Sequence, residues 1–149
     1  RTVMSNVRDF ASNLKVTQVV DPVVITSDAN GASVDMKGYG SVAFYALVGE
    51  SGDTLSGSVY IELEIEDSDN DSDWADAVDA DVRSSVTGNN TGTFAKIDAA
   101  TEDDAVFLGQ YDGSSRYVRP VINVTGTHTN GTPIGIIAVQ SMADVLPVT

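Results

Sequence analysis

Turn residues recur every eight to twelve positions along most of this chain, and this spacing is the feature that most restricts its fold. After residue 20 the apolar residues show almost no helical periodicity and form short alternating or β-branched runs. Short strands separated by regular turns are typical of an antiparallel β-sandwich or jelly roll, not of a fold that alternates strands and helices. We therefore expect an all-β, antiparallel β-sandwich or jelly-roll-like domain over residues 19–149, preceded by a short N-terminal arm, residues 1–18.

The region from Tyr111 to Gln140 shows this organisation most plainly. A β-branched run from Arg116 to Thr125 and an apolar run from Ile134 to Val139 flank a connection of Gly, Thr, Asn and Pro over Gly126–Pro133. Gly and Asn accept the positive φ angles that a reversal needs, so we expect the two runs to pair as a hairpin. Because Pro120 cannot donate to a strand ladder, we expect a bulge or a sheet edge there.

Two further strands are predicted to meet different surroundings. Ser41–Gly49 is apolar at both its odd and its even positions, as expected of a strand that is covered on both sides. In the next strand, the apolar residues of Val59–Ile65 alternate with Glu62, Glu64 and Glu66. This alternation predicts a half-buried strand whose three carboxylates lie on an outer face, where they are solvated or meet the cations of a partner.

The charge and the cysteine content exclude several classes of function. The formal net charge is -14, from 22 acidic and 8 basic residues, and the chain contains no cysteine. Lys and Arg supply most of the affinity for phosphate backbones, so we expect no direct binding of nucleic acid and no membrane partner. Without cysteine there are no disulfides, no thiol catalysis and no thiolate metal sites.

Residues 1–20 differ from the rest of the chain in charge. They carry three basic residues and one acid, a net charge of +2, so the remainder carries -16 of the total of -14. Four apolar residues lie three or four positions apart, as on one face of a short amphipathic helix. They are Val3, Val7, Phe10 and Leu14. The segment is either an unanchored terminus or a basic arm that docks on an acidic neighbouring surface. The candidate contact residues of such an arm are Arg1, Val3, Val7, Arg8, Phe10, Leu14 and Lys15.

Ten of the 22 acids lie between Glu62 and Asp81, and calcium takes oxygen ligands from such residues. The spacing is not that of an EF-hand loop, because the positions of its required Gly and Glu hold Ser72 and Val78. We therefore favour a solvated turn without metal. If a cation does bind here, the candidate ligands are Asp67, Asp69, Asp71 and Asp73.

No set of residues stands out as catalytic. His128 is the only histidine, and we expect it to be an exposed residue of a turn, without the partners of a triad or a zinc site. There is no phosphate-binding loop, and none of the many acids is singled out as a glycosidase pair. We expect that the chain is not an enzyme and uses no cofactor.

Arg116 and Arg119 are two of the eight basic residues. Their odd spacing places them on opposite faces of a predicted strand. We expect one of them to pair with a carboxylate of a neighbouring strand and the other to meet solvent or a partner.

The stretches IELEIEDSDNDSDWADAV and GQYDGSSRYVRPVINVTGTHTNGTPIGIIAV carry a family resemblance. A strand ends in an acidic turn, an aromatic residue follows, and an Arg-Tyr-Val-Arg strand then precedes a Thr/Gly-rich connection. Over residues 19–140 the chain resembles a capsid decoration, or cement, protein of a tailed bacteriophage with an HK97-like head.

The resemblance implies a structural virion protein on the outer surface of the phage head. Such a protein binds the major capsid protein from outside and stabilises the shell, often as a homo-oligomer, for which we favour a trimer. The arm residues and Glu62, Glu64 and Glu66 would then contact the capsid. Two alternatives stay open, a head-tail connector or tail virion protein and a carbohydrate- or calcium-binding β-sandwich module.

Overall fold

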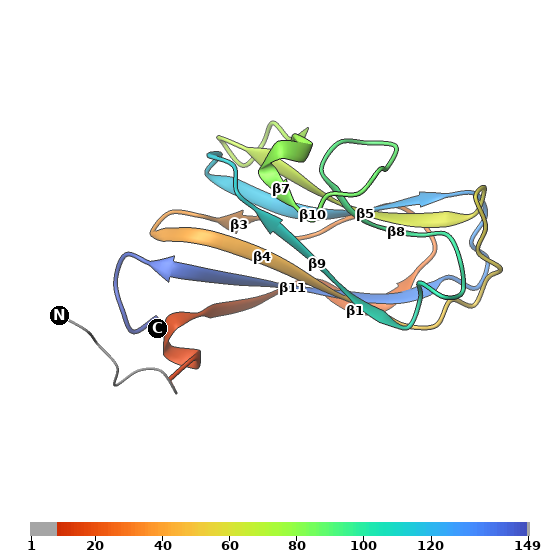
Figure 1. Ribbon diagram of the computed structural model, residues 1–149, viewed down its shortest axis with the longest axis horizontal. Helices are drawn as coiled ribbons and strands as arrows, with labels where there is room; N and C mark the ends of the chain where they lie inside the picture. The colour runs from red at the N-terminus through yellow and green to blue at the C-terminus, as the bar shows by residue number, and fades with distance from the viewer. Residues whose placement is uncertain (1–8, 149) are drawn as a thin grey trace.

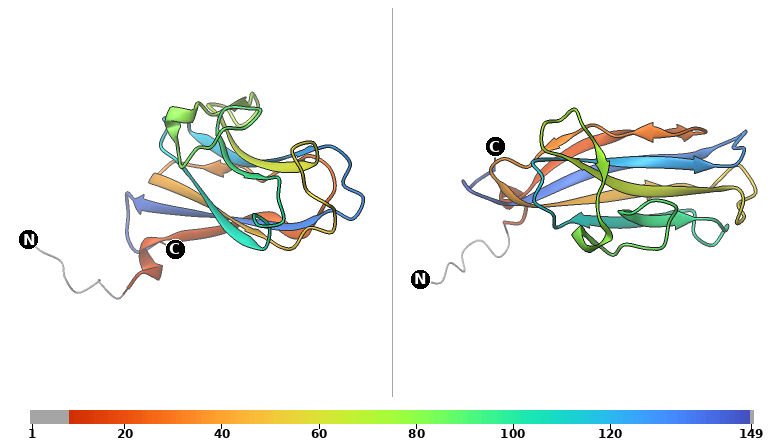
Figure 2. Two further views of the ribbon diagram at one scale, coloured as in Figure 1. Left: turned by 45° about the vertical axis from the view of Figure 1, so that its right-hand side comes forward. Right: turned by 90° about the horizontal axis from the view of Figure 1, so that it is seen from above.

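The computed structural model describes residues 9–148 as two antiparallel β-sheets packed face to face (Figure 1, Figure 2). The prediction of an all-β sandwich is confirmed. No helix among the described residues has the length and apolar character needed to cross a membrane. The elements in chain order are η1 (Ala11–Asn13), β1 (Lys15–Ile25), β2 (Ala29–Asn30), β3 (Val34–Asp35), β4 (Tyr39–Val48), β5 (Tyr60–Ser68), β6 (Ala75–Asp76), η2 (Asp79–Asp81), β7 (Val82–Arg83), β8 (Thr93–Ile97), β9 (Ala105–Tyr111), β10 (Tyr117–Thr125) and β11 (Thr132–Ala143).

The strand order is that of a jelly roll. One sheet, here called the β4 sheet, has the order β1-β11-β4-β9-β7, and the other, the β5 sheet, has β2-β10-β5-β6 with β3 beside β10 and β8 beside β5. Early strands pair with late ones, β1 with β11, β2 and β3 with β10, β4 with β9, and β5 with β8. These pairs form one long antiparallel ribbon folded across two sheets.

Both sheets contribute to a single apolar core. Successive side chains of a strand point to opposite faces, so each central strand buries every second residue between the layers. In β5 these are the residues that the alternation predicts as inward-facing. The fully buried apolar residues of the four central strands include Val42, Phe44, Ala46, Ile61, Leu63, Ile65, Val118, Ile122, Ile134, Ile136 and Ala138.

The predicted hairpin of the C-terminal third is wrong. β10 lies in the β5 sheet and β11 lies in the β4 sheet, so the two strands face each other across the core and do not pair. The connection between Thr125 and Thr132 contains Gly126 at a φ of 83° and Gly131 at a φ of 75°. Gly and Asn permit a sharp reversal, but the same residues serve an arch between layers about 10 Å apart.

Pro120 lies where one edge of β10 is interrupted. The pairing of β10 with β5 runs without a register shift through Pro120, so the strand has no bulge at this position. On its other side β10 pairs with two short strands that flank the proline, and the Gly31 N–H donates to the Pro120 carbonyl at 2.8 Å. The missing N–H therefore faces no full-length partner strand.

The boundary between arm and domain also differs from the prediction. β1 begins at Lys15, whose register partner is Gln140, so residues 15–18 belong to the sheet and not to an arm. The only described helical turn of the predicted arm is η1, of three residues. The predicted amphipathic stripe, from Val3 to Leu14, begins outside the described residues, and its described part holds only this turn before β1.

Candidate functional site

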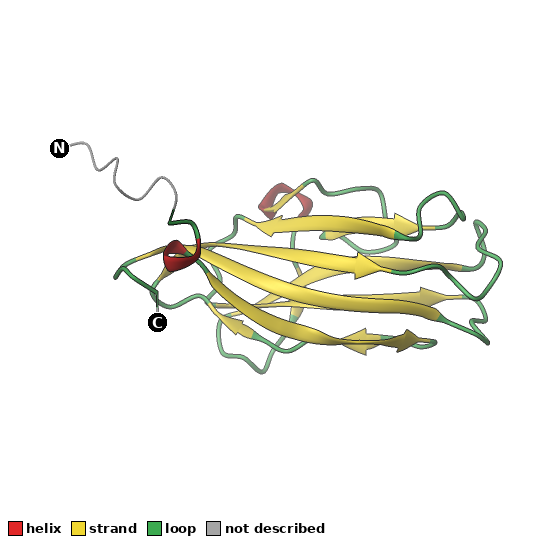
Figure 3. Cartoon of the chain, turned by 90° about the horizontal axis from the view of Figure 1, so that it is seen from below, coloured by secondary structure: helices red, strands yellow, loops and turns green. Residues whose placement is uncertain are grey.

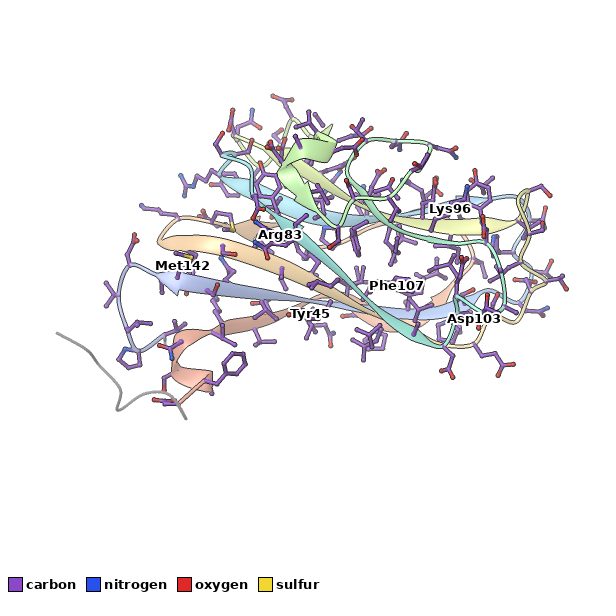
Figure 4. The ribbon with its side chains drawn as sticks, in the orientation of Figure 1. Tyr45, Arg83, Lys96, Asp103, Phe107 and Met142 are labelled. Atoms are coloured by element: carbon purple, nitrogen blue, oxygen red, sulfur yellow. The ribbon has the colours of Figure 1, made fainter. Side chains whose placement is uncertain are left out.

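The outer face of the β4 sheet is a broad apolar surface that the described chain leaves open. Figure 3 shows this face from outside, crossed by no other described segment apart from η1 at one end. Tyr45 points away from the second sheet, Leu47 is 52% exposed and Val106 is 64% exposed (Figure 4). The register of β1, β11, β4 and β9 aligns the outward side chains in rows. The apolar members are Val16, Val24, Ala43, Tyr45, Leu47, Val106, Leu108, Pro133, Ile137 and Val139.

This face carries no charge at the outward positions of β1, β11, β4 and β9, and a charge enters only at its edge, where Arg83 of β7 lies in register with Gln110 and pairs with Asp112. Its polar positions are uncharged, and Asp21, in the bulge of β1, lies at its margin and accepts a hydrogen bond from Gln18. The solvent side of an antiparallel sheet is normally polar, and this chain has 22 acids available to make it so. An uncharged face in so acidic a chain is a candidate interaction surface. Its polar members are Gln18, Ser41, Gln110 and Ser141.

The prediction that Ser41–Gly49 is covered on both sides is wrong for the described chain, since Tyr45 and Leu47 are exposed. Apolar residues at both odd and even positions show that both faces of a strand avoid water. They do not show whether the same chain or another molecule covers each face. Four strands about 4.8 Å apart, with about eight residues each at about 3.3 Å, form a face on the order of 500 Å². This matches the largest apolar patches of typical monomers, about 300–600 Å².

A groove of about 620 Å³ lies at one end of this face. Pro22, Leu47 and Val106 are among the residues that line it, and Gly135 lies on its floor. A Cβ atom on Gly135 would come within 3.1 Å of the Pro22 side chain, so glycine both keeps the floor low and lets β1 approach. The groove gives the face a recess whose lining is mainly apolar, with Gln18 and Asp104 as its polar members.

The acidic outer face predicted for β5 is not exposed. Glu62 and Glu64 are each 2% exposed, because residues 84–92 fold over this strand. The Asn89 N–H donates to Glu62 Oε1 at 3.0 Å, and Asn90 Nδ2 donates to Glu64 Oε2 at 2.9 Å. The alternation showed correctly that these residues leave the core face, but a loop from a distant part of the sequence covers them. Glu62 and Glu64 therefore cannot contact a capsid in this conformation.

Both arginines near β10 form ion pairs within the chain. Arg119 Nε donates to Glu66 Oε2 at 2.7 Å, and its guanidinium lies 4.4 Å from the centre of the Trp74 ring. Glu66, the third predicted capsid contact, is thus engaged inside the sheet. Arg116 donates to both carboxylate oxygens of Asp35, and this side-chain hydrogen bond lowers the pKa of Asp35 to about 2. Arg119 confirms the prediction that one arginine pairs with a carboxylate of a neighbouring strand, whereas Arg116, which was expected to meet solvent or a partner, also pairs with such a carboxylate.

The acidic turn after β5 does not gather its candidate ligands at one point. Asp67 accepts a hydrogen bond from Tyr111 Oη at 2.6 Å, and Asp73 accepts one from Asn70 Nδ2 at 2.7 Å. Burial and the bond to Asp67 raise the pKa of Tyr111 to about 12. Asp69 is exposed, as is Asp71. Within residues 9–148, one group of three acids has oxygens within 4.8 Å of one another, and its members are Glu64, Glu66 and Asp76.

His128 is not the exposed turn residue that the sequence predicts, since its side chain is fully buried. Its Nε2 lies 3.1 Å from the Thr125 carbonyl oxygen, and its Nδ1 lies 3.8 Å from Asp53 Oδ2. Asp53 also accepts from the backbone N–H groups of Asn130, at 3.0 Å, and Gly131, at 2.6 Å. The imidazole thus packs where the arch between β10 and β11 meets the connection between β4 and β5, a structural role that local turn composition does not reveal.

The predicted arm residues are only partly described. Phe10 is exposed, Leu14 is half-buried, and Lys15 lies in β1 with its Nζ 5.7 Å from the centre of the Tyr39 ring. Their role in docking stays a prediction. The remaining arm candidates, which lie outside the described residues, are Arg1, Val3, Val7 and Arg8.

Sequence reasoning missed the outer face of the β4 sheet as a functional surface. The available signal was the apolar character of Ser41–Gly49 at both parities, together with Val106 and Leu108 in the short apolar strand that follows the acidic turn. No known protein family matches the chain, and no curated protein matches its sequence.

Proposed function

We propose that this chain is a non-enzymatic structural protein that binds the outside of a tailed-phage capsid and stabilises the shell. The observation that carries the proposal is the uncharged apolar outer face of the β4 sheet, a docking surface on a β-sandwich. The sequence resemblance to capsid decoration proteins favours a virion role on the outer surface of the head. A jelly roll by itself hosts many functions, so the fold supports only the rigid body that such a role needs.

The partner is the major capsid protein, and the contact is apolar. A face on the order of 500 Å² from each side buries about 1,000 Å² in total, which is below the range of stable interfaces of about 1,200–2,000 Å². One copy would therefore bind weakly. Copies that touch several shell subunits at once gain effective concentration, so repeated binding over a shell compensates for the small face.

Stabilisation of the shell follows from selective binding. A ligand that binds the assembled state and not the separated subunits shifts the equilibrium toward assembly by mass action. The acidic surface of this chain, with a net charge of -14, would also keep it away from packaged nucleic acid. Both effects favour an external position.

The test is co-sedimentation of the purified protein with expanded, DNA-free capsids. Binding should saturate at a copy number comparable with that of the shell subunits. Leu47→Asp should weaken binding at least tenfold, because a charge at the centre of an apolar contact costs about 2 kcal/mol or more. The matched control is Val78→Asp, since Val78 is 55% exposed and Leu47 is 52% exposed, but Val78 lies away from the β4 sheet.

Other outcomes would contradict the proposal in informative ways. Binding at a single vertex would indicate a connector or tail protein. Glycan binding, or a melting temperature that rises with calcium, would indicate a binding module. Equal loss of capsid binding in both variants would show that the outer face of the β4 sheet is not the docking surface.

A further inference from the structure

The outer edge of β9 is unpaired over most of its length. β9 pairs with β4 from Ala105 to Tyr111, but on its other side β7 reaches only Gln110 and Tyr111. Within the described residues, the stretch Ala105–Gly109 has no backbone hydrogen bond on this side. A row of free N–H and C=O groups is a template for another strand.

The opposite edge of the same sheet is protected in a way that β9 is not. β1 contains two register shifts, Pro22 and the charged Asp21, and its Val19 carbonyl accepts a hydrogen bond from the Ala32 N–H at 2.8 Å. Bulges, proline and charge are the devices that keep edge strands apart. Ala105–Tyr111 contains no charged residue and no proline.

We propose that two copies of this chain pair through this edge, with β9 antiparallel to β9 about a two-fold axis beside Phe107. Phe107 is the midpoint of the free stretch, and identical edges form a self-complementary contact under a two-fold axis. The chain enters β9 through Asp104, whose φ is 50° and whose N–H donates to the Gly49 carbonyl at 3.3 Å, so the backbone at this end is held on the β4 side and not on the free edge.

The charges at the two ends of β9 fit this arrangement. Arg83 lies at one end of the strand and Asp103 at the other, with Phe107 between them (Figure 4). Both ends are already engaged within the chain: Arg83 pairs with Asp112 at 2.8 Å, and Asp103 accepts a hydrogen bond from the Ser51 N–H at 2.9 Å. Antiparallel pairing brings the 67% exposed side chain of Arg83 of each copy toward Asp103 of the other, so these end charges do not oppose contact along the uncharged strand.

Pairing would also join the two outer faces. Val106 and Leu108 both point outward, and about an axis at Phe107 each Val106 lies opposite Leu108 of the second copy. The two β4 sheets then form one continuous sheet with an apolar face on the order of 1,000 Å². The inference goes beyond the proposed function and does not depend on it, because it concerns the purified chain alone.

The first test measures mass and amide exchange of the full chain. Sedimentation equilibrium should give twice the chain mass of 15.6 kDa at high concentration and the chain mass on dilution. Within residues 105–109, the amides that point to the free edge should exchange slowly in the dimer and fast after dilution, while those bonded to β4 should change little. A monomer at every concentration, a trimer, or a dimer whose β9 amides exchange freely would overturn the proposal.

The second test uses the absence of cysteine from the chain. Val106→Cys and Leu108→Cys, both at exposed positions, should form a disulfide-linked dimer when the two variants are mixed and oxidised. Neither variant should crosslink by itself, and Leu47→Cys, on the same face but in β4, should not crosslink with either. Crosslinking of Val106→Cys alone at the level of the mixture would contradict the axis at Phe107 and overturn the proposal.

A charge variant separates the edge from the face. Val106→Lys should shift the chain to the monomer, because lysine on an edge strand opposes pairing. Leu47→Lys alters the same outer face one strand inward and should remain dimeric. If both variants dimerise as the unmodified chain does, β9 is not the contact.

Discussion

At the scale of single residues, the buried carboxyl of Glu64 makes stability depend on pH. Burial raises the pKa of Glu64, the hydrogen bond from Asn90 and the nearby amide of Asn123 partly offset this, and the charges of Asp76 and Glu66 raise it further. The folded chain therefore holds this proton to a higher pH than the unfolded chain does. Its contribution to the free energy of unfolding is fully present below the unfolded pKa of about 4.5 and is lost as the pH rises through the higher folded value.

Replacing the carboxyl by an amide removes this dependence. Glu64→Gln stays neutral and can still accept the hydrogen bond from Asn90, so it should melt at a higher temperature than the unmodified chain above the folded pKa. The difference in melting temperature between the two chains should shrink as the pH falls toward 4. Thermal unfolding followed by circular dichroism between pH 4 and 8 measures this difference. Glu50→Gln, at an exposed position, is the control, and a difference independent of pH would contradict the assignment.

At the scale of the elements, periodicity predicted the strands better than their partners. The alternation in Val59–Ile65 and the apolar run in Ile134–Val139 both correspond to central strands. The partner of β10 could not be read from Gly126–Pro133, because the same turn residues suit a hairpin within one sheet and an arch between two. The cover over Glu62 and Glu64 comes from residues 84–92, a long-range contact that no local pattern encodes.

Arg119 of β10 lies in register opposite Glu66 of β5 and adds a side-chain link between the two strands. This guanidinium pairs with Glu66, at side-chain exposures of 19% and 16%, and stacks on Trp74. Arg119→Ala leaves a half-buried carboxylate without its cation and should lower the free energy of unfolding by about 2 kcal/mol. Arg116→Ala breaks the exposed pair with Asp35 and should cost less than about 1 kcal/mol.

Urea unfolding of both arginine variants measures these costs. A double-mutant cycle of Arg119→Ala with Glu66→Ala separates the free energy of the ion pair from that of the stacking on Trp74. Equal losses in Arg119→Ala and Arg116→Ala would show that burial of the pair does not set its contribution.

At the scale of the whole molecule, the fold class could be predicted from the sequence, but the candidate site could not. Turn spacing indicates a sandwich whichever strands pair, so the class follows from composition and period. The outer face of the β4 sheet, by contrast, was interpreted as core because Ser41–Gly49 is apolar at both parities. That interpretation assumed that the chain covers its own apolar surface, and Tyr45 and Leu47 contradict the assumption.

The separation of an uncharged face from an acidic remainder predicts how the molecule responds to salt. With a net charge of -14, repulsion among the acids opposes the compact state, and it acts over about 30 Å at 0.01 M salt but only about 8 Å at 0.15 M. The melting temperature should therefore rise between these salt concentrations at neutral pH. Near pH 4.1, the isoelectric point expected from the sequence, the rise should vanish because little net charge remains to be screened. A melting temperature that falls with salt at neutral pH would show that attractive ion pairs, such as Arg116 with Asp35, outweigh the repulsion.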